Sequence, residues 1–544
     1  MTPDRIILAD TIHTLEPGHR GPVQAIATSG GRITALGTRD DAGSWAAAGT
    51  EILDLGSATV VPGLVDAHAH PVFGLDITAG ADLSGVQDLD EVRRRLAAEA
   101  SRLGPGEWIQ AWGLDPNAFG GVPVTAEAVE GVLGGRPAFV RLFDGHSALA
   151  SSRALEVAGI DGPRSFDGAA SVVCDADGRP TGLLLEFPAC ELVARHLPAE
   201  TLEQRGDRLA QVLEGFAAAG LTGVHVMDHS EESAALYRAL EERGELPVRL
   251  RCSPWCSPGT GPDAWAALAA TIGIGGRRWE VAGIKLFIDG TIDNGTAWLY
   301  EQDTLGESTA AYWPDPAEYS RAVAFFAERG IPTATHAIGD AGVGHVLDAL
   351  LALKPVVRGR AVHRIEHIET VPDAVVERFI GSGVVASMQP THCTHYSRAD
   401  QSDNWSVRLG PVRARRAWRC RDLRDLGTTL ALGSDWPIAP FPPLPIIADA
   451  QLRRRAGTHD EPILPSQALT ARQALEGYTS HAARAAGAWG ESGSIAVGKR
   501  ADLTFLELDP LTAEPDELAE SAVLGTAVDG DLRLGMARAE RLSF

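Results

Sequence analysis

The sequence predicts an α/β protein that combines a (β/α)8 barrel, a β-sandwich composed of both ends of the chain, and an inserted α/β segment. Three observations predict it: the chain length, an alternation of strand-like and helix-like segments, and strand-rich ends. The 544 residues exceed an ordinary domain of about 150 residues, whereas a barrel with insertions takes about 250 to over 400. With 44% hydrophobic and 22% charged residues, the composition excludes disordered and fibrous proteins.

The two ends of the chain predict short strands separated by turns. At the N-terminal end these cover residues 5–9, 25–28, 32–37 and 51–55, where no helix of core length fits. A similar pattern returns at 493–506, 522–528 and 532–536. Chain termini commonly lie near each other, so we expect residues 1–61 and 489–544 to form the two halves of one sandwich.

The middle of the chain, residues 62–488, predicts the barrel. Helix-like stretches such as 205–219, 230–243, 316–329 and 372–380 alternate with apolar runs, which is typical of parallel strands with helical crossovers. Eight such runs, the number that closes a barrel, occur at 60–70, 222–228, 248–253, 281–287, 333–336, 362–367, 384–389 and 429–435. The gap between the first two runs predicts an insertion at about 80–200, with apolar stretches of its own at 108–112, 138–142 and 182–185.

The net charge of the chain and its targeting features limit the partners and the cellular location that we expect. The formal net charge of −24 at pH 7 repels nucleic acid and anionic membrane surfaces, so small molecules are the expected partners. Neither a signal peptide nor an apolar run of membrane-spanning length is evident, and we expect a cytoplasmic protein. The six cysteines are sparse, and we interpret Cys252 and Cys256 as buried thiols rather than a zinc knuckle.

Two histidines end the first apolar run. His68 and His70 are two residues apart in Asp66-Ala67-His68-Ala69-His70, so on a strand they face the same side. Adjacent imidazoles at the C-terminal end of a barrel strand can chelate one metal, and barrel enzymes place their catalytic groups at this end. Such a pair also occurs by chance, so it does not suffice alone.

Other runs end in residues that suit a metal site as well. The fifth ends at His336, the sixth at His367 and the eighth at Asp435. The fourth contains Lys285 within Gly283-Ile284-Lys285-Leu286-Phe287, an apolar setting that is costly for an unmodified ammonium. Metal-capable side chains at the ends of strands 1, 5, 6 and 8, with a lysine on strand 4, together predict a metal centre.

The order of these motifs resembles the amidohydrolase superfamily, and more narrowly its YtcJ-like branch, which includes N-substituted formamide deformylases. The similarity spans essentially the whole chain and includes Gly31–Gly37, Pro62–Pro71, Asp144-Gly145-His146, Lys285 with Asp289-Gly290, His336–Asp340, Arg364-Ile365-Glu366-His367, Met388-Gln389-Pro390, Gly433–Pro437 and Ala474–Thr479. The resemblance implies a TIM barrel, a composite sandwich and hydrolysis of an amide-type bond at one or two metals.

The resemblance also implies roles for particular residues. It assigns His68, His70 and Asp435 to one divalent metal, and His336 with His367 to a second; zinc is the expected metal. Lys285 matches a carboxylated lysine that bridges two metals in relatives, and carboxylation would turn a buried cation into an anionic ligand. Water on the metals would have its pKa lowered towards about 7. Asp435 is the expected catalytic residue, which takes the proton of this water and returns it to the leaving nitrogen.

Five residues are candidates for substrate contact: His146, Trp112, Asp289, Gln389 and Trp436. His146 follows the family's Asp-Gly-His pattern, with packing as its alternative role. Several of the 12 tryptophans could line an apolar pocket, although tryptophans also fill cores, and the candidates are Trp112, Trp298, Trp313, Trp405 and Trp436.

The remaining histidines near the strand ends receive non-ligand interpretations. We expect His225 and His229 to make core or supporting hydrogen bonds and His363 to be structural. His392 and His395 lie in Thr391–Tyr396, where relatives often have a single polar contact residue. We interpret that segment as a solvated loop, with contact to substrate or a stray ion as the alternative.

The predicted function is metal-dependent hydrolysis of a non-peptide C–N bond in a small-molecule amide, such as an N-formyl or N-acyl amine. One alternative is a deaminase or cyclic-amide hydrolase with a single metal, against which Lys285 argues, because such deaminases usually lack this lysine ligand. A second alternative is a non-catalytic binding protein, which would be expected to have lost a ligand, whereas all six positions are filled. A homodimer is common among relatives.

Overall fold

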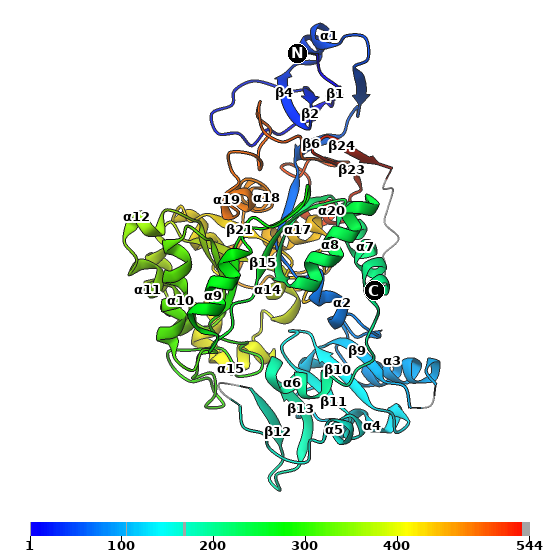
Figure 1. Ribbon diagram of the computed structural model, residues 1–544, viewed down its shortest axis with the longest axis vertical. Helices are drawn as coiled ribbons and strands as arrows, with labels where there is room; N and C mark the ends of the chain where they lie inside the picture. The colour runs from blue at the N-terminus through cyan, green and yellow to red at the C-terminus, as the bar shows by residue number, and fades with distance from the viewer. Residues whose placement is uncertain (1, 105, 167–169, 536–544) are drawn as a thin grey trace.

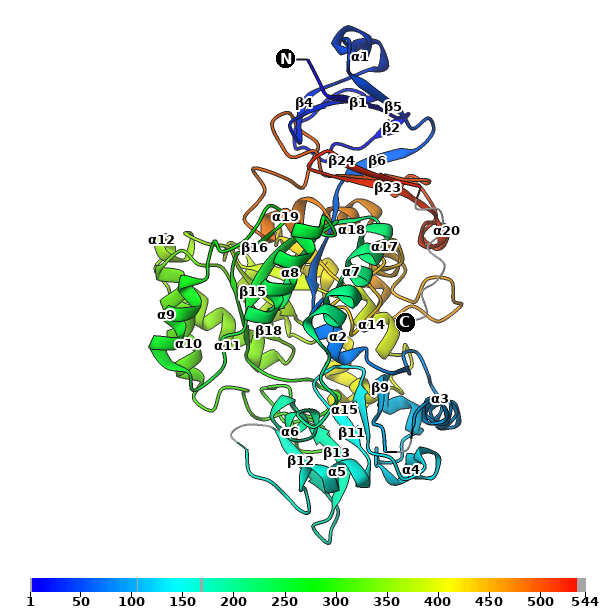
Figure 2. The same cartoon turned by 45° about the vertical axis from the view of Figure 1, so that its right-hand side comes forward.

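A computed structural model describes residues 2–104, 106–166 and 170–535 (Figure 1). Residues 536–544 of the predicted C-terminal sandwich half lie outside the described residues. Strands from the two ends of the chain lie at one pole of an elongated molecule, the barrel elements occupy the middle, and the inserted segment lies at the opposite pole (Figures 1 and 2).

The middle of the molecule has a TIM-barrel-type α/β fold whose strands form two parallel sheets. One sheet has the order β16-β15-β14-β7 and the other β17-β18-β19-β20-β21. The strands are β7 (Leu64–Ala69), β14 (Leu221–His229), β15 (Arg249–Pro254), β16 (Trp279–Val281), β17 (Ile284–Phe287), β18 (Thr333–Ala337), β19 (His363–His367), β20 (Val385–Met388) and β21 (Leu430–Leu432). The strands of the predicted barrel are thus divided between two sheets. Two isolated parallel bridges connect these sheets: Trp255↔Lys285, between the end of β15 and β17, and Ala69↔Trp436, between β7 and the segment after β21.

Helices follow the barrel strands, as the alternation predicts. They include α7 (Leu202–Ala218), α8 (Glu231–Arg243), α9 (Gly261–Ala270), α10 (Pro316–Glu328), α11 (Asp340–Leu351), α13 (Asp373–Val376), α14 (Pro390–Tyr396), α15 (Asn404–Arg413) and α17 (Pro443–Leu452). Capping boxes at Thr201 and Ser230 satisfy backbone N–H groups at the starts of α7 and α8. The buried faces of these helices join the strands in one large apolar core, which fixes the strand ends where the site lies.

Strands from both termini pair at the sandwich pole. One sheet, β4-β3-β1-β5, is N-terminal, and the other, β2-β6-β22-β23-β24, joins the two ends of the chain. In the second sheet β6 (Thr59–Pro62) runs antiparallel to β22 (Leu503–Leu506). A separate apolar cluster contains Ile7 and Ile26 from the first sheet and Phe505 from the second, so the sheets pack face to face. The other strands are β1 (Arg5–Leu8), β2 (Thr11–Ile12), β3 (Ala25–Ser29), β4 (Arg32–Gly37), β5 (Glu51–Asp54), β23 (Val523–Val528) and β24 (Asp531–Leu534).

The inserted segment has a sheet of its own, ordered β12-β13-β11-β10-β9-β8. Its elements are β8 (Ala81–Asp82), α3 (Leu89–Arg102), β9 (Ile109–Leu114), α4 (Glu127–Leu133), β10 (Ala138–Leu142), β11 (Ala148–Ala150), α5 (Ser152–Ala158), β12 (Ser171–Cys174), β13 (Pro180–Leu185) and α6 (Phe187–Ala194). Two apolar clusters stabilise this sheet. The turn between β10 and β11 carries Asp144 and His146, which reach the barrel.

Among the described residues, no helix is both long and apolar enough to cross a membrane. All six cysteines are free thiols, and every one except Cys174 is buried.

Candidate metal centre

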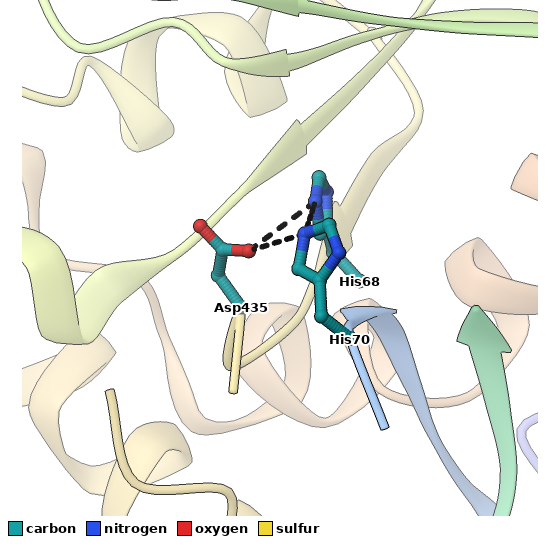
Figure 3. Close-up of side chains that lie close together, drawn as sticks. All are labelled: His68, His70 and Asp435. Atoms are coloured by element: carbon teal, nitrogen blue, oxygen red, sulfur yellow. Dashed lines mark hydrogen bonds and ion pairs between the residues drawn. The ribbon is translucent and has the colours of Figure 1, made fainter. Parts of the chain in front are cut away.

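His68, His70 and Asp435 converge where β7 meets the segment after β21 (Figure 3). Asp435 Oδ1 lies 3.3 Å from His68 Nε2 and 3.2 Å from His70 Nε2, and the two nitrogens are 3.3 Å apart. All three residues are buried. We refer to them as the first group.

Backbone contacts hold the first group together. The N–H of Asp435 donates to the carbonyl of His68 at 2.7 Å, and the N–H of His70 donates to that of Trp436 at 2.8 Å. The carboxylate of Asp66 accepts from the N–H groups of His68 and Ser434, each at 3.0 Å. These bonds fix β7 against the turn that carries Asp435.

The backbone of this turn is unusual. Asp435 has a φ of 60°, a left-handed conformation that is uncommon outside glycine. A side chain at Gly433 would bring its Cβ within 2.7 Å of both Asp66 Oδ1 and the N of His68. His367 and Glu186, both near the same site, also have positive φ values of 74° and 65°. Such strain clusters where the surrounding structure holds functional groups in place.

A polar relay formed by Glu366, Arg364 and His225 supports the ring of His68 through its Nδ1. Its Nδ1 lies 2.6 Å from Glu366 Oε2, Glu366 Oε1 pairs with Arg364 Nε at 2.7 Å, and Arg364 Nη1 donates to His225 Nδ1 at 2.9 Å. Because a carboxylate accepts, Nδ1 of His68 carries the proton, and Nε2 faces the centre with its lone pair. This is the arrangement that orients metal-binding imidazoles.

Burial keeps the site histidines neutral. It lowers the pKa of His68, His336 and His367 well below the usual value, and the nearby Lys285 ammonium lowers each further. Neutral imidazole is the form that binds metal ions.

Asp435 also faces a second set of histidines. His367, His392 and Asp435 offer ligand atoms within 4.8 Å of one another, and we call them the second group. Asp435 Oδ2 lies 3.8 Å from His367 Nδ1 and 3.6 Å from His392 Nε2. The rings of His367 and His392 are parallel within 7°, with centroids 5.9 Å apart.

The interpretation of Thr391–Tyr396 as a solvated loop is wrong. The segment is helix α14, which begins at Pro390, and Thr391, His392, Cys393 and Thr394 are all buried. Proline suits the first turn of a helix because its missing N–H would be unpaired there. The helix lies against α17, where Thr394 Oγ1 and His395 Nε2 both contact Asp449.

His336 lies beside this second group without entering it. Its ring centroid is 4.5 Å from that of His367, and its Nε2 donates to the carbonyl of Gly290 at 3.1 Å. Because a carbonyl only accepts, Nε2 carries the proton and Nδ1 has the free lone pair. The histidine pair implied by the resemblance is therefore adjacent, although the group that joins His367 to Asp435 contains His392 and not His336.

Lys285 points into the same centre from β17. Its Nζ lies 3.2 Å from His68 Nε2 and 4.9 Å from the centroid of the Phe287 ring. The residue is fully buried, and burial lowers the pKa of its amine to about 8. Asp289, the carboxylate that might have paired with it, instead accepts from the backbone N–H groups of Trp298, Ile338 and Gly339.

Two cavities meet at the centre and share six residues in their walls: Asp144, His146, His336, His367, Asp435 and Ile438. One, of about 450 Å³, is lined by Asp144, Asp293, Glu369, Trp405, Trp418 and Tyr396, among others, and we call it the acidic cavity. The other, of about 350 Å³, is lined by Phe73, Phe187, Trp255, Phe287, Ile77 and Lys285, among others, and we call it the aromatic cavity.

The five substrate-contact candidates lie at different distances from this space. His146 lines both cavities, and its Nδ1 lies 3.0 Å from Glu186 Oε2. Burial alone would lower the pKa of His146, but the Glu186 carboxylate reverses the direction and raises it. Gln389 Oε1 accepts from His367 Nδ1 at 2.9 Å, which orients that ring.

Trp112 and Trp436 are not among the residues that line the two cavities. Trp112 lies on β9 of the inserted sheet, and Trp436 packs against Phe216 and Phe441. Trp313 is buried and donates to the carbonyl of Phe287, while Trp405 lines the acidic cavity. Sequence reasoning missed Trp255, Trp418 and Phe187, because nothing in their local sequence shows which aromatic residues face the cavities.

The donor set fits a divalent cation. Asp435 Oδ1, His70 Nδ1 and His392 Nε2 are buried and have no hydrogen-bond partner among the described residues. Buried polar atoms are normally paired. A divalent cation bound by Asp435 Oδ1, His68 Nε2 and His70 Nε2 would have one oxygen and two imidazole nitrogens as ligands. This ligand set suits zinc.

The fold and this histidine–aspartate centre define a barrel protein with a metal-capable site at the C-terminal ends of its strands. The model of the amidohydrolase family matches residues 51–533, and the chain belongs to this family.

Individual relatives cover nearly the whole chain. N-substituted formamide deformylase of Arthrobacter pascens is 28% identical over 97% of this chain and 98% of its own. The putative amidohydrolase YtcJ of Bacillus subtilis (strain 168) is 27% identical over 89% of this chain and 90% of its own. The crystal structure of an uncharacterized metal-dependent hydrolase from Pyrococcus horikoshii superposes with a TM-score of 0.71 at 25% identity, covering 94% of this chain and 99% of that one. Together these similarities support a hydrolase that uses a divalent metal.

Proposed function

We propose that the protein hydrolyses a non-peptide C–N bond of a small-molecule amide, such as an N-formyl or N-acyl amine, with metal-activated water. The convergence of His68, His70 and Asp435, with an unpartnered carboxylate oxygen at its centre, carries this proposal. The deformylase named among the relatives acts, by its name, on N-substituted formamides, which supports this bond type.

In this proposal His68, His70 and Asp435 hold the first ion, with zinc as the expected metal. His367 would hold a second ion together with one other histidine. The resemblance implies His336, whereas the ligand atoms of His367, His392 and Asp435, which lie within 4.8 Å of one another, favour His392. A bound divalent cation lowers the pKa of its water to about 7, which makes hydroxide available at neutral pH.

The residues of this chain would then move the protons. Asp435 would accept the proton of the attacking water through Oδ2, which faces His367 and His392, and return it to the leaving nitrogen as the C–N bond breaks. One water and one amide give one carboxylic acid and one amine, so atoms and charge balance. Glu366 would keep the lone pair of His68 Nε2 directed at the centre throughout.

We also propose that Lys285 is carboxylated. Its neutral amine would attack carbon dioxide, losing one proton, and the resulting carbamate would place two oxygens that share one negative charge where Nζ now faces His68. The test is ¹³C NMR of the metal-loaded protein after incubation with ¹³C-bicarbonate, with Lys285→Arg as the control. A carbamate signal lost in the variant supports the modification; no signal in the wild-type protein contradicts it.

The test of the function is turnover by metal-loaded protein on four substrate classes: N-formyl amines, N-acyl amines, N-acyl amino acids and cyclic amides. Bound metal is quantified in parallel. About two equivalents with activity on a linear amide agree with the proposal. One equivalent with activity on cyclic amides or deamination substrates indicates the single-metal alternative, and no bound metal without turnover indicates a binding protein.

The proposal also includes a cellular location and an oligomeric state. Six free cysteines, five of them buried, suit a reducing compartment, which supports the cytoplasm as the place of action. A homodimer, which the family resemblance implies, is testable by light scattering.

A further inference from the structure

The acidic and aromatic cavities adjoin at the metal centre and share Asp435, Asp144, Ile438 and three histidines of their lining. A bond that is broken at this centre can therefore have one substituent in each cavity. An amide has two such substituents, an acyl group and an amine. The different chemistry of the two cavities therefore selects which substituent lies in which.

The aromatic cavity suits an uncharged group. Phe73, Phe187, Trp255 and Phe287 form a cluster in which neighbouring ring centroids lie 5.2 to 6.2 Å apart. Ile77 extends the apolar wall. The charged lining residues are engaged elsewhere, because Lys285 is directed at His68 and Asp144 accepts from the N–H groups of His146 and Ser147 and from Asn294. Burial of apolar surface therefore dominates on this side.

The acidic cavity has the opposite character. Asp144, Asp293 and Glu369 contribute carboxylates to its wall, and none of its lining residues is a lysine or arginine. Asp144 is satisfied by the N–H groups of His146 and Ser147 and by Asn294. The other two carboxylates are only half satisfied.

Asp293 accepts from Asn404 through Oδ1 alone, and Glu369 accepts from Trp405 Nε1 through Oε2 alone. Asp293 Oδ2 and Glu369 Oε1 form no hydrogen bond among the described residues, and His392 Nδ1 lies 3.8 Å from Glu369 Oε1. Glu369 is only 7% exposed, and burial raises the pKa of Asp293 well above its usual value, so a cation in this cavity would stabilise both carboxylates. The side chains of this wall include no lysine or arginine that could provide the charge.

A further polar atom of the same cavity also lacks a partner. His392 lines the cavity and is 6% exposed, and its Nε2 forms no hydrogen bond among the described residues. The rings of Trp405 and Trp418 stack 4.7 Å apart in the same wall and offer π surfaces, on which organic cations are stabilised.

We propose that the amine portion of the substrate occupies the acidic cavity and carries a positive charge of its own, while an apolar acyl group occupies the aromatic cavity. The substrate class is then a mono-N-acylated diamine or a similar cationic amide. N-acyl amino acids are disfavoured, because their carboxylate would lie beside Asp293 and Glu369 in a wall to which the chain contributes no lysine or arginine. This inference rests on the proposed function, since it assigns the two sides of the amide bond that is hydrolysed.

The first experiment compares three formamides that differ only in a para substituent remote from the reacting bond. N-formyl-4-(aminomethyl)benzylamine presents an ammonium, N-formyl-4-ethylbenzylamine is neutral, and 4-(formylaminomethyl)benzoate is an anion. We expect kcat/KM of the ammonium substrate to exceed that of the neutral one by about tenfold, with the anion slowest, and the preference to shrink at high salt. Equal values, or a preference for the anion, would overturn the inference.

The second experiment removes one charge of the wall. Asp293→Asn keeps the shape of the side chain and the acceptor for Asn404, so the ratio of kcat/KM between the ammonium and the neutral substrate should fall. Asp40→Asn is the matched control, since Asp40 is exposed on helix α1 (Arg39–Trp45) in the sandwich. If Asp293→Asn does not fold, Glu369→Gln replaces it, with the ratio between substrates as the readout.

Binding separates this inference from the proposed function. Calorimetry with metal-loaded protein compares 4-methylbenzylammonium with 4-methylbenzyl alcohol, neither of which can be hydrolysed. Tighter binding of the ammonium, weakened by Asp293→Asn, supports the acidic cavity even if no amide is turned over, which would refute only the hydrolytic function. Turnover of all three formamides at equal rates, with equal binding of the two probes, refutes the inference alone.

Discussion

The two groups that share Asp435 differ in how firmly they are held. In the first group, Asp435 Oδ1 lies within 3.3 Å of both histidine nitrogens, and the relay from Glu366 fixes His68. In the second group, Asp435 Oδ2 is 3.6 to 3.8 Å from its histidines, and His392 comes from helix α14 rather than from a barrel strand. The first group is thus preformed for an ion, whereas the second must contract around one.

The largest effect should follow from the residue that both groups share. Asp435→Asn removes the proton acceptor and one anionic ligand, and we expect kcat to fall by about 10³-fold. The fold should persist, because asparagine tolerates the left-handed conformation of this residue. Activity assays, metal analysis and thermal unfolding check this prediction. Near-normal turnover with unchanged metal content would show that Asp435 belongs to neither group.

The next variant loosens the first group alone. Glu366→Gln keeps an acceptor for His68 Nδ1 but removes its charge, so affinity for the first ion should fall by about 10- to 100-fold. Competition with a metal chelator measures this affinity. His363→Gln is the control on the same strand, since His363 pairs with Thr333 Oγ1 away from the centre. Equal losses in both variants would mean that the effect comes from destabilised β19 and not from the relay.

A smaller effect should follow in the second group. His392→Ala should weaken binding of the second equivalent of metal by about tenfold and leave the first unchanged, because the contact of His392 with Asp435 is long. His395→Ala on the same helix is the control, since His395 faces Asp449. If His336→Ala removes the second equivalent and His392→Ala does not, the pairing of His336 with His367 implied by the family resemblance holds instead.

The sequence predicts those parts of the site that lie on the barrel strands or at their ends. The C-terminal ends of parallel strands meet at one edge, so His68, His336, His367 and Asp435 could be expected together from their positions alone. Lys285 could be expected to point inward because it interrupts an apolar strand, and its Nζ does reach His68. The barrel-type fold follows from the same alternation, although two sheets connected by isolated bridges were not predictable from apolar runs.

The sequence does not predict those parts of the site whose position depends on the helices and turns that follow the strands. His392 looked solvated because Thr391–Tyr396 is polar, and only Pro390 at the helix start could have indicated α14. Glu366 stood within a recognised motif but received no role, although a carboxylate next to Arg364 in a buried strand was a signal. Two consecutive residues, Glu366 and His367, face one centre because φ of His367 is 74°, which strand alternation does not allow for.

The smallest expected effect is the coupling between the two groups. If the two groups were independent, Glu366→Gln would reduce affinity for the first ion by the same factor with and without His392→Ala. Because both groups use the carboxylate of Asp435, loss of the second ion leaves this carboxylate to serve the first ion alone. The cost of Glu366→Gln should therefore be smaller in the His392→Ala background, by about 1 kcal/mol. Chelator competition on the four proteins of this cycle measures the difference. Losses that add within about 0.3 kcal/mol would mean that Asp435 serves only one ion, and the comparison between a preformed and a contracting group would then reduce to one site with a neighbouring histidine.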